Sequence, residues 1–123
     1  MKSVTITFQK SAFPRTHVVF FIGKLDEHSC DGACKKVNNF YRKNKAVDTL
    51  VLDFSNLLSL NSKAIGQIME LSNILSQEEK RLIISGPSLN VLSVLDMLGV
   101  RRTLEIVKSL EEVKSSIVEE YSL

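Results

Sequence analysis

The sequence predicts one α/β domain built on a mixed, mostly parallel β-sheet with about four α-helices. Three observations support this fold class. From residue 29 onwards, short apolar runs alternate with amphipathic stretches of helical period. Two apolar runs near the N-terminus are separated only by a short connection, which is typical of a hairpin. The 123 residues suit one domain and contain no linker or repeat, so residues 1–123 are assigned to a single domain.

The first two strands are predicted to form an antiparallel hairpin. Ser3 to Gln9, SVTITFQ, alternates apolar and polar residues and indicates a strand with one exposed face and a free edge. A connection containing Phe13 and Pro14 follows. His17 to Ile22, HVVFFI, is a continuous apolar run that predicts a buried strand ended by Gly23.

The middle of the chain alternates helix and strand. A helix is expected from Ser29 to Lys43, and a second from Ser62 to Gln77. Between them, Thr49 to Phe54, TLVLDF, is almost wholly apolar, as expected for a strand covered on both faces of a parallel sheet. The strand Arg81 to Ser85 follows and is stopped by the pair GP.

The last third predicts two further helices and one short strand. One helix carries Val91 and Leu95 and ends at Gly99, and the strand Leu104 to Val107 follows. The last helix begins with a capping box. The residues of the capping box and of the apolar face behind it are Ser109, Glu112, Val113, Ile117 and Tyr121.

Composition excludes several classes of function. A net charge of +2 is too small to indicate a nucleic-acid partner. No apolar run is long enough to span a bilayer, and the N-terminus lacks the continuous apolar core of a signal peptide. We therefore expect a cytoplasmic protein that contacts neither nucleic acid nor membrane.

The two cysteines do not indicate a redox or a metal site. Cys30 and Cys34 are not in the redox spacing C-x-x-C, and no other cysteine completes a zinc site. They fall on the apolar stripe of the first helix, which favours buried structural thiols. We expect no metal site and no cofactor.

Two polar segments are expected at one edge of the sheet. In parallel sheets, functional groups gather beyond the carboxyl ends of the strands. Gly23 to Ser29 follows the second predicted strand, and Leu57 to Gly66 follows the third. These segments are the candidates for a functional site.

Four short motifs, in their order along the chain, resemble those of one family. They are GKLD from Gly23 to Asp26, VLDFS from Val51 to Ser55, NSKA from Asn61 to Ala64, and LDMLGV from Leu95 to Val100. The chain resembles the STAS family, which is named for sulphate transporters and anti-sigma-factor antagonists. The resemblance covers nearly the whole chain and implies a single STAS domain.

The resemblance implies a non-enzymatic domain that works by docking. In antagonist members, the serine matching Ser62 is phosphorylated by an anti-sigma factor that is itself a serine kinase. The unphosphorylated antagonist binds that kinase and frees the sigma factor, and a metal-dependent phosphatase of the PP2C type resets the switch. The resemblance therefore implies phosphorylation of Ser62 and partner switching for this chain.

The expected partner-binding residues are Asp26, Asn61, Ser62, Lys63 and Ala64. Asp26 matches the family's aspartate and is expected to hold the loop of Ser62 by hydrogen bonding. The family pattern is changed at three positions: Asn61 replaces an acidic residue, Lys63 a small residue and Ala64 a glycine. Lys63 would favour a phosphoserine electrostatically once it is formed, yet could hinder the kinase that forms it.

Ser62 has two interpretations that the sequence leaves open. Serine is a favoured helix N-cap, worth about 1 kcal/mol over alanine, so Ser62 could simply cap the helix that follows. Alternatively, Ser62 is the phosphorylated switch. If no phosphate is added, the chain is a degenerate STAS scaffold, or a subunit of a larger transport or signalling assembly.

A hydrolase is the remote alternative. Asp26, His28 and Ser62 lie in segments of one sheet edge and supply an acid, a base and a nucleophile. No G-x-S-x-G elbow surrounds the serine. The sequence therefore favours a binding module over an enzyme.

Overall fold

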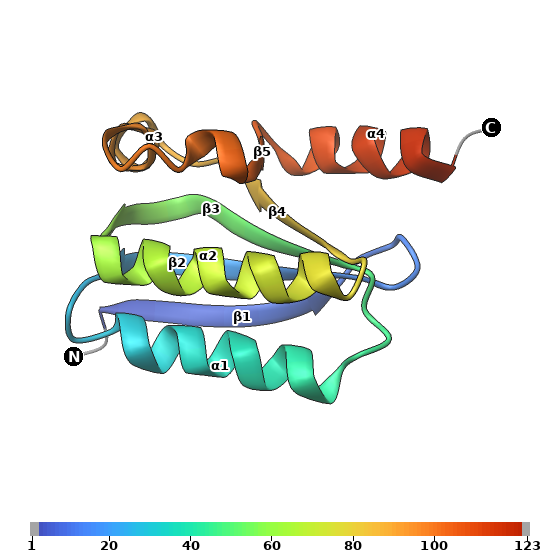
Figure 1. Cartoon of the computed structure of the whole chain (residues 1–123), viewed down its shortest axis with the longest axis horizontal. Coiled ribbons are helices and arrows are strands. Elements are labelled where there is room, and N and C mark those ends of the chain that lie inside the picture. The colour runs from blue at the N-terminus through green and yellow to red at the C-terminus, as the bar shows by residue number, and fades with distance from the viewer. Residues whose placement is uncertain (1–2, 122–123) are drawn as a thin grey trace.

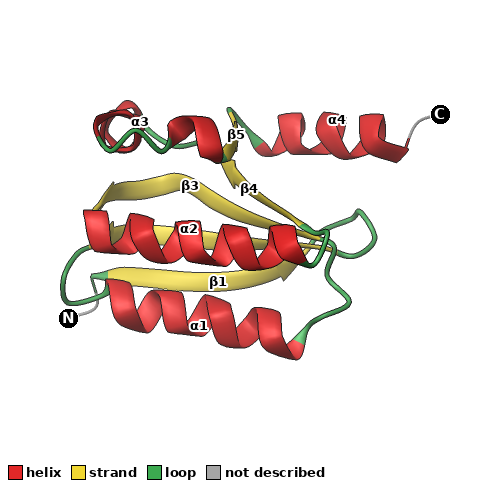
Figure 2. Ribbon diagram, in the orientation of Figure 1, coloured by secondary structure: helices red, strands yellow, loops and turns green. Residues whose placement is uncertain are grey.

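The computed structural model describes residues 3–121, with side chains up to residue 118. Within this range the chain forms one five-stranded sheet and four α-helices, as the sequence predicts (Figure 2). The elements are β1 (Val4–Lys10), β2 (Thr16–Leu25), α1 (Cys30–Lys43), β3 (Thr49–Leu60), α2 (Ser62–Gln77), β4 (Arg81–Ser85), α3 (Leu89–Met97), the 3₁₀ turn η1 (Arg101–Thr103), β5 (Glu105–Val107) and α4 (Leu110–Tyr121).

The sheet is mixed and mostly parallel, because only the first pair of strands is antiparallel. β1 pairs antiparallel with β2, and β3, β4 and β5 then follow in parallel, in the order β1-β2-β3-β4-β5. The predicted hairpin and the free edge at β1 are both confirmed. Since every parallel crossover steps one strand in the same direction, right-handed connections place α1, α2 and α3 on one face.

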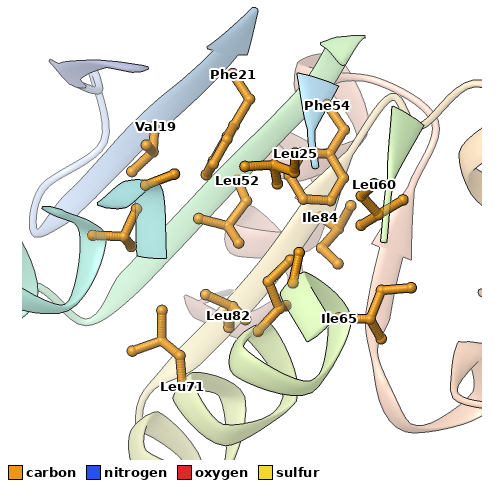
Figure 3. Close-up of a cluster of buried hydrophobic side chains, with 14 of the residues drawn as sticks. Val19, Phe21, Leu25, Leu52, Phe54, Leu60, Ile65, Leu71, Leu82 and Ile84 are labelled. Atoms are coloured by element: carbon orange, nitrogen blue, oxygen red, sulfur yellow. The ribbon is translucent and has the colours of Figure 1, made fainter. Parts of the chain in front are cut away.

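The two faces of the sheet have cores of unequal size. On the first face, side chains of α1, α2 and α3 pack with those of the strands in one large buried cluster. Figure 3 shows its centre, where Phe21 of β2 and Phe54 of β3 meet edge to face with ring centroids 5.2 Å apart. On the second face, α4 packs Val113 and Ile117 against the strands. Tyr121, which the sequence places on the same helix face, lies outside the described side chains.

The central strand is buried from both sides. Val51 faces the second core and Leu52 the first, and neither is more than 1% exposed. Cover on both faces of a parallel sheet therefore explains the continuous apolar run TLVLDF, as the sequence predicts. The buried carboxylate of Asp53, within this strand, accepts hydrogen bonds from the backbone N–H and the hydroxyl of Ser55.

Two strand ends were predicted wrongly. β2 does not end at Gly23 but continues to Leu25, and β3 does not end at Phe54 but continues to Leu60. Irregular pairing near Gly23 lets the two strands stay together. Gly23 has a φ of +115°, and a Cβ there would lie 2.2 Å from the carbonyl oxygen of Ser3. The glycine therefore permits a close approach of β1 instead of stopping the strand.

The cysteines lie on the inner stripe of α1 as predicted, but to different depths. Cys30 is fully buried, and Cys34 is half-buried; both are free thiols. Burial, with smaller contributions from Cys30 and Asp31, raises the pKa of Cys34 to about 11. A thiol with so high a pKa is protonated at neutral pH and is a poor nucleophile.

Candidate functional site

The two segments expected at the sheet edge do meet there. Leu25 at the end of β2 pairs with Leu60 at the end of β3. One residue further, the backbone N–H of Asn61 donates to the carbonyl oxygen of Leu25 at 2.9 Å. The start of α1 and the start of α2 are thereby held side by side at one end of the sheet (Figure 1).

Asn61, not Ser62, caps α2, so the interpretation of Ser62 as the N-cap is wrong. The Asn61 side chain accepts a hydrogen bond from the N–H of Ala64 at 2.9 Å, and its backbone is extended, with φ −95° and ψ 170°. Because β3 runs to Leu60, Asn61 is the single residue between strand and helix. An N-cap needs that non-helical backbone, and Ser62 already belongs to the first turn.

Ser62 is exposed and its hydroxyl is unused. Within residues 3–121 that hydroxyl makes no hydrogen bond. The Asn61 side chain accepts a hydrogen bond from the N–H of Ala64, and the Asn61 carbonyl oxygen accepts one from the N–H of Ile65. The N–H groups of Ser62 and Lys63 have no partner in the described part of the chain, as expected for the first turn of a helix. An anion at Ser62 would meet free donors and the positive end of the helix dipole.

Lys63 reaches away from the helix to an acid on α1. Its ammonium lies 3.0 Å from a carboxylate oxygen of Asp31, and the Gln67 amide donates to the other oxygen at 2.9 Å. Hydrogen bonds from Gln67 and Lys63 hold the pKa of Asp31 below its usual value, and the bond to Asp31 raises the pKa of Lys63. Asp31 thus joins α1 to α2 across the mouth of the site, and all three side chains remain in contact with solvent.

Asp26 does not hold the loop of Ser62, contrary to the expectation. Its carboxylate accepts from the backbone N–H groups of His28 and Ser29, both at 3.0 Å, within its own turn. Burial alone would raise the pKa of Asp26, but hydrogen bonds from Ser3, His28 and Ser29 lower it overall. The role of Asp26 is to close the turn that starts α1, which places Asp31 opposite Lys63.

The remaining predicted contact residues divide into core and surface. Ala64 is fully buried and belongs to the core of the first face. Ala64 therefore offers no surface to a partner, and its N–H is already bonded to Asn61. Of the predicted partner-binding set, Ser62 and Lys63 are exposed, while Asn61 and Asp26 are half-buried.

Three further side chains of this edge were not singled out by the sequence, although one of them, Leu58, lies within a candidate segment. Asp31 gave no signal, because its pairing with Lys63 depends on how α1 lies against α2. Leu58 is 61% exposed at the end of β3, and Leu89 is 84% exposed at the start of α3. The Asn90 amide donates to the carbonyl oxygen of Leu58 at 3.0 Å, which brings the start of α3 to the same edge. Two large exposed apolar side chains so placed are typical of a docking surface.

The hydrolase alternative has no catalytic geometry to support it. His28 is 82% exposed at its side chain, with its nearest charged neighbour, Glu27, 3.8 Å away. Within the described residues, no hydrogen bond joins the side chains of Asp26, His28 and Ser62 to one another; among these three residues, the Asp26 carboxylate accepts only from the backbone N–H of His28. A nucleophile and its base must lie within hydrogen-bonding reach, and here they do not.

The described residues contain neither a cluster of metal ligands nor a helix suited to a membrane. The described part of the chain holds no group of three or more His, Cys, Asp or Glu side chains placed to bind a metal ion. Among its helices, none combines the length and apolarity that crossing a membrane requires.

Comparison with known families gives the same assignment as the four motifs. The chain matches the STAS domain over residues 7–113. The chain belongs to the STAS family. No curated protein matches the sequence of this STAS domain.

Solved structures confirm the STAS fold. The anti-sigma factor antagonist SpoIIAA in its unphosphorylated form is 20% identical with a TM-score of 0.73, covering 91% of this chain and 96% of that one. SpoIIAA of Bacillus in its phosphorylated form is also 20% identical, with a TM-score of 0.67 over 91% and 99%. An anti-sigma factor antagonist from Mycobacterium paratuberculosis is 14% identical, with a TM-score of 0.77 over 93% of each chain.

Proposed function

We propose that this STAS domain is an antagonist-type regulatory protein that docks on an anti-sigma factor with serine kinase activity. The docking surface is the sheet edge formed by the starts of α1, α2 and α3. Phosphorylation of Ser62 switches docking off, and a phosphatase of the PP2C type restores it. This scheme places the protein in the cytoplasm, with its kinase.

The observation that carries the proposal is the division of labour between Asn61 and Ser62. Asn61 caps α2, and Ser62 is exposed with an unused hydroxyl. A kinase can therefore modify Ser62 without removing the cap that starts the helix. The change of Asp to Asn in the family motif is compatible with this role, because an amide oxygen caps a helix as a carboxylate does.

The proposed switch needs no change of fold. A phosphate adds about −1.5 to −2 charges at neutral pH, and the free N–H groups at the start of α2 stabilise it there. The same charge repels or desolvates a partner that docks over Leu58 and Leu89. The structural likeness to SpoIIAA in both its phosphorylated and unphosphorylated forms supports the idea that one backbone accommodates both states.

Lys63 favours a second candidate, a STAS scaffold that is never phosphorylated. The lysine stands where antagonist members carry a small residue, and it is held across the mouth of the site by Asp31. A kinase would have to accept or displace this ion pair to reach Ser62. The scaffold would use the same edge for a stable partner, with no covalent switch.

Mass spectrometry with fragment mapping on the protein purified from its native cells separates the two candidates. A phosphate on Ser62 supports the switch. An unmodified Ser62 across growth and stress conditions contradicts the switch and leaves the scaffold.

Partner binding by two matched variants adds a second line of evidence. Ser62→Asp introduces a charge at the docking edge, whereas Ser115→Asp introduces one at an exposed serine of α4. We expect Ser62→Asp to lose the co-purified kinase and Ser115→Asp to retain it. Equal retention by the two variants would show that charge at Ser62 does not control docking.

A further inference from the structure

The second face of the sheet is only half covered. α4 lies on this face and contacts β4 and β5, and its side chains Val113 and Ile117 fill the second core. None of the described helices lies over β1 on this face, and on β2 only the part with Val18 and Phe20 packs against α4, whereas α1 and α2 lie side by side across the first face (Figure 1). Thr5 and Thr7 of β1 are exposed there, and Ile22 of β2 remains 49% exposed.

An apolar groove runs along the boundary between α4 and this bare half. Its volume is about 220 Å³. The floor is made by Val18 and Phe20 of β2, and one wall by Leu110 and Val113 of α4. Phe13, from the connection between β1 and β2, closes one end. These residues belong to the second core or pack against it, so the groove continues that core to the surface.

The groove is rimmed by positive charge. Lys10 at the end of β1 and Lys114 on α4 line it, and no carboxylate does. Neither lysine forms an ion pair within the described residues, although other lysines and arginines in that range do. An apolar floor between two unpaired cations is complementary to a partner that carries both apolar and acidic groups.

The backbone of the groove offers few hydrogen bonds to a ligand. In the connection that closes it, the N–H of Ser11 donates to Thr16, the N–H of Phe13 to the Ser11 hydroxyl, and the Thr16 hydroxyl to Pro14. A partner strand or extended peptide would leave its own backbone groups unpaired here. A helix brings its backbone bonds already satisfied and needs only an apolar face to dock.

We propose that the groove and the adjoining bare face of β1 and β2 bind an acidic amphipathic helix of a partner protein. The helix lies beside α4, places apolar side chains on Phe20 and Ile22, and directs its acidic flanks towards Lys10 and Lys114. It completes the helical layer that the first face already has. This surface is separate from the edge of Ser62, so it gives the domain a second docking site.

The test uses a synthetic amphipathic helix of about 18 residues, with leucine along one stripe and glutamate on both flanks. The control peptide carries lysine in place of every glutamate. Binding at low salt is followed by the amide chemical shifts of the labelled full chain. We expect the acidic peptide to bind at least about tenfold more tightly and to shift the amides of Phe20 and Val113.

Charge-reversal variants test whether the peptide binds at this groove. Lys10→Glu with Lys114→Glu removes the cationic rim from exposed positions and should abolish the preference for the acidic peptide. Lys35→Glu with Lys43→Glu changes the net charge equally on exposed positions of α1 and should preserve it. Equal binding of both peptides, equal effects of the two double variants, or shifts confined to the Ser62 edge would each overturn the proposal. Binding of decanoate in the groove without either peptide would also overturn it, in favour of a small amphiphile.

Discussion

The two faces of the sheet differ in how completely they are covered. Within the described residues, α1, α2 and α3 bury a large cluster on the first face, and α4 buries a much smaller one on the second. The first face fixes the edge that carries Ser62, because α1, α2 and α3 begin there and the first two are bridged by Asp31 and Lys63. The second face retains exposed surface over β1 and the end of β2, with Thr5, Thr7 and Ile22. The comparison suggests that stability resides mainly on one face and leaves the other available for binding.

The largest expected effect is the loss of stability on truncating a side chain in each of the two cores. Phe54→Ala removes a fully buried ring from the first face and should cost about 3–5 kcal/mol of unfolding free energy. Ile117→Ala on α4 should cost close to 2 kcal/mol, the low end for such a truncation, because the smaller core around it relaxes more readily. Urea unfolding of both variants measures the difference. An equal loss would mean that the second face contributes as much to stability as the first.

Removing a helix cap should have an intermediate effect on stability, larger on the first face than on the second. Asn61→Ala removes the cap of α2 and should cost about 1 kcal/mol. Ser109→Ala should cost less, about 0.5 kcal/mol, because the bond from the N–H of Glu112 to the Ser109 hydroxyl is long, at 3.4 Å.

Ser62→Ala is the matched control for the cap of α2. Since Ser62 is exposed and is not the cap, the substitution should change stability by no more than about 0.5 kcal/mol. Thermal unfolding of the three variants checks the order. If Ser62→Ala proved as costly as Asn61→Ala, the assignment of the cap to Asn61 would fail.

The smallest effect concerns the bridge between α1 and α2. Hydrogen bonds from Gln67 and Lys63 lower the pKa of Asp31 in the folded state, so ionised Asp31 stabilises the fold above its unfolded pKa of about 3.9. That contribution is lost as the pH falls through the lower folded pKa. Asp31→Asn should therefore be slightly less stable than the natural chain at pH 7 and equal to it at strongly acidic pH.

The test for Asp31 is urea unfolding at both pH values, in low and high salt. The exposed position of Asp31 and Lys63 means that added salt should shrink the difference at pH 7. A difference that is independent of pH would show that the two helices are joined by packing alone.

The sequence by itself determined the order and type of the elements. The alternation in SVTITFQ, the continuous run TLVLDF and the helical stripes each report a local burial pattern. These patterns were confirmed in the sheet and in the four helices, with Tyr121 of α4 outside the described side chains. The meeting of the second and third strand ends also followed, because parallel strands share one carboxyl edge.

Only the tertiary structure decided which residue caps α2 and what surrounds Ser62. Pairing with β2 carries β3 on to Leu60, and this long-range contact moves the cap from Ser62 to Asn61. The ion pair of Asp31 with Lys63 and the bare half of the second face depend on how whole helices lie against the sheet. The local sequence pattern indicates which side chains are buried, but not which distant residues they contact. The pairing of β3 with β2 is such a distant contact, and it leaves the Ser62 hydroxyl free.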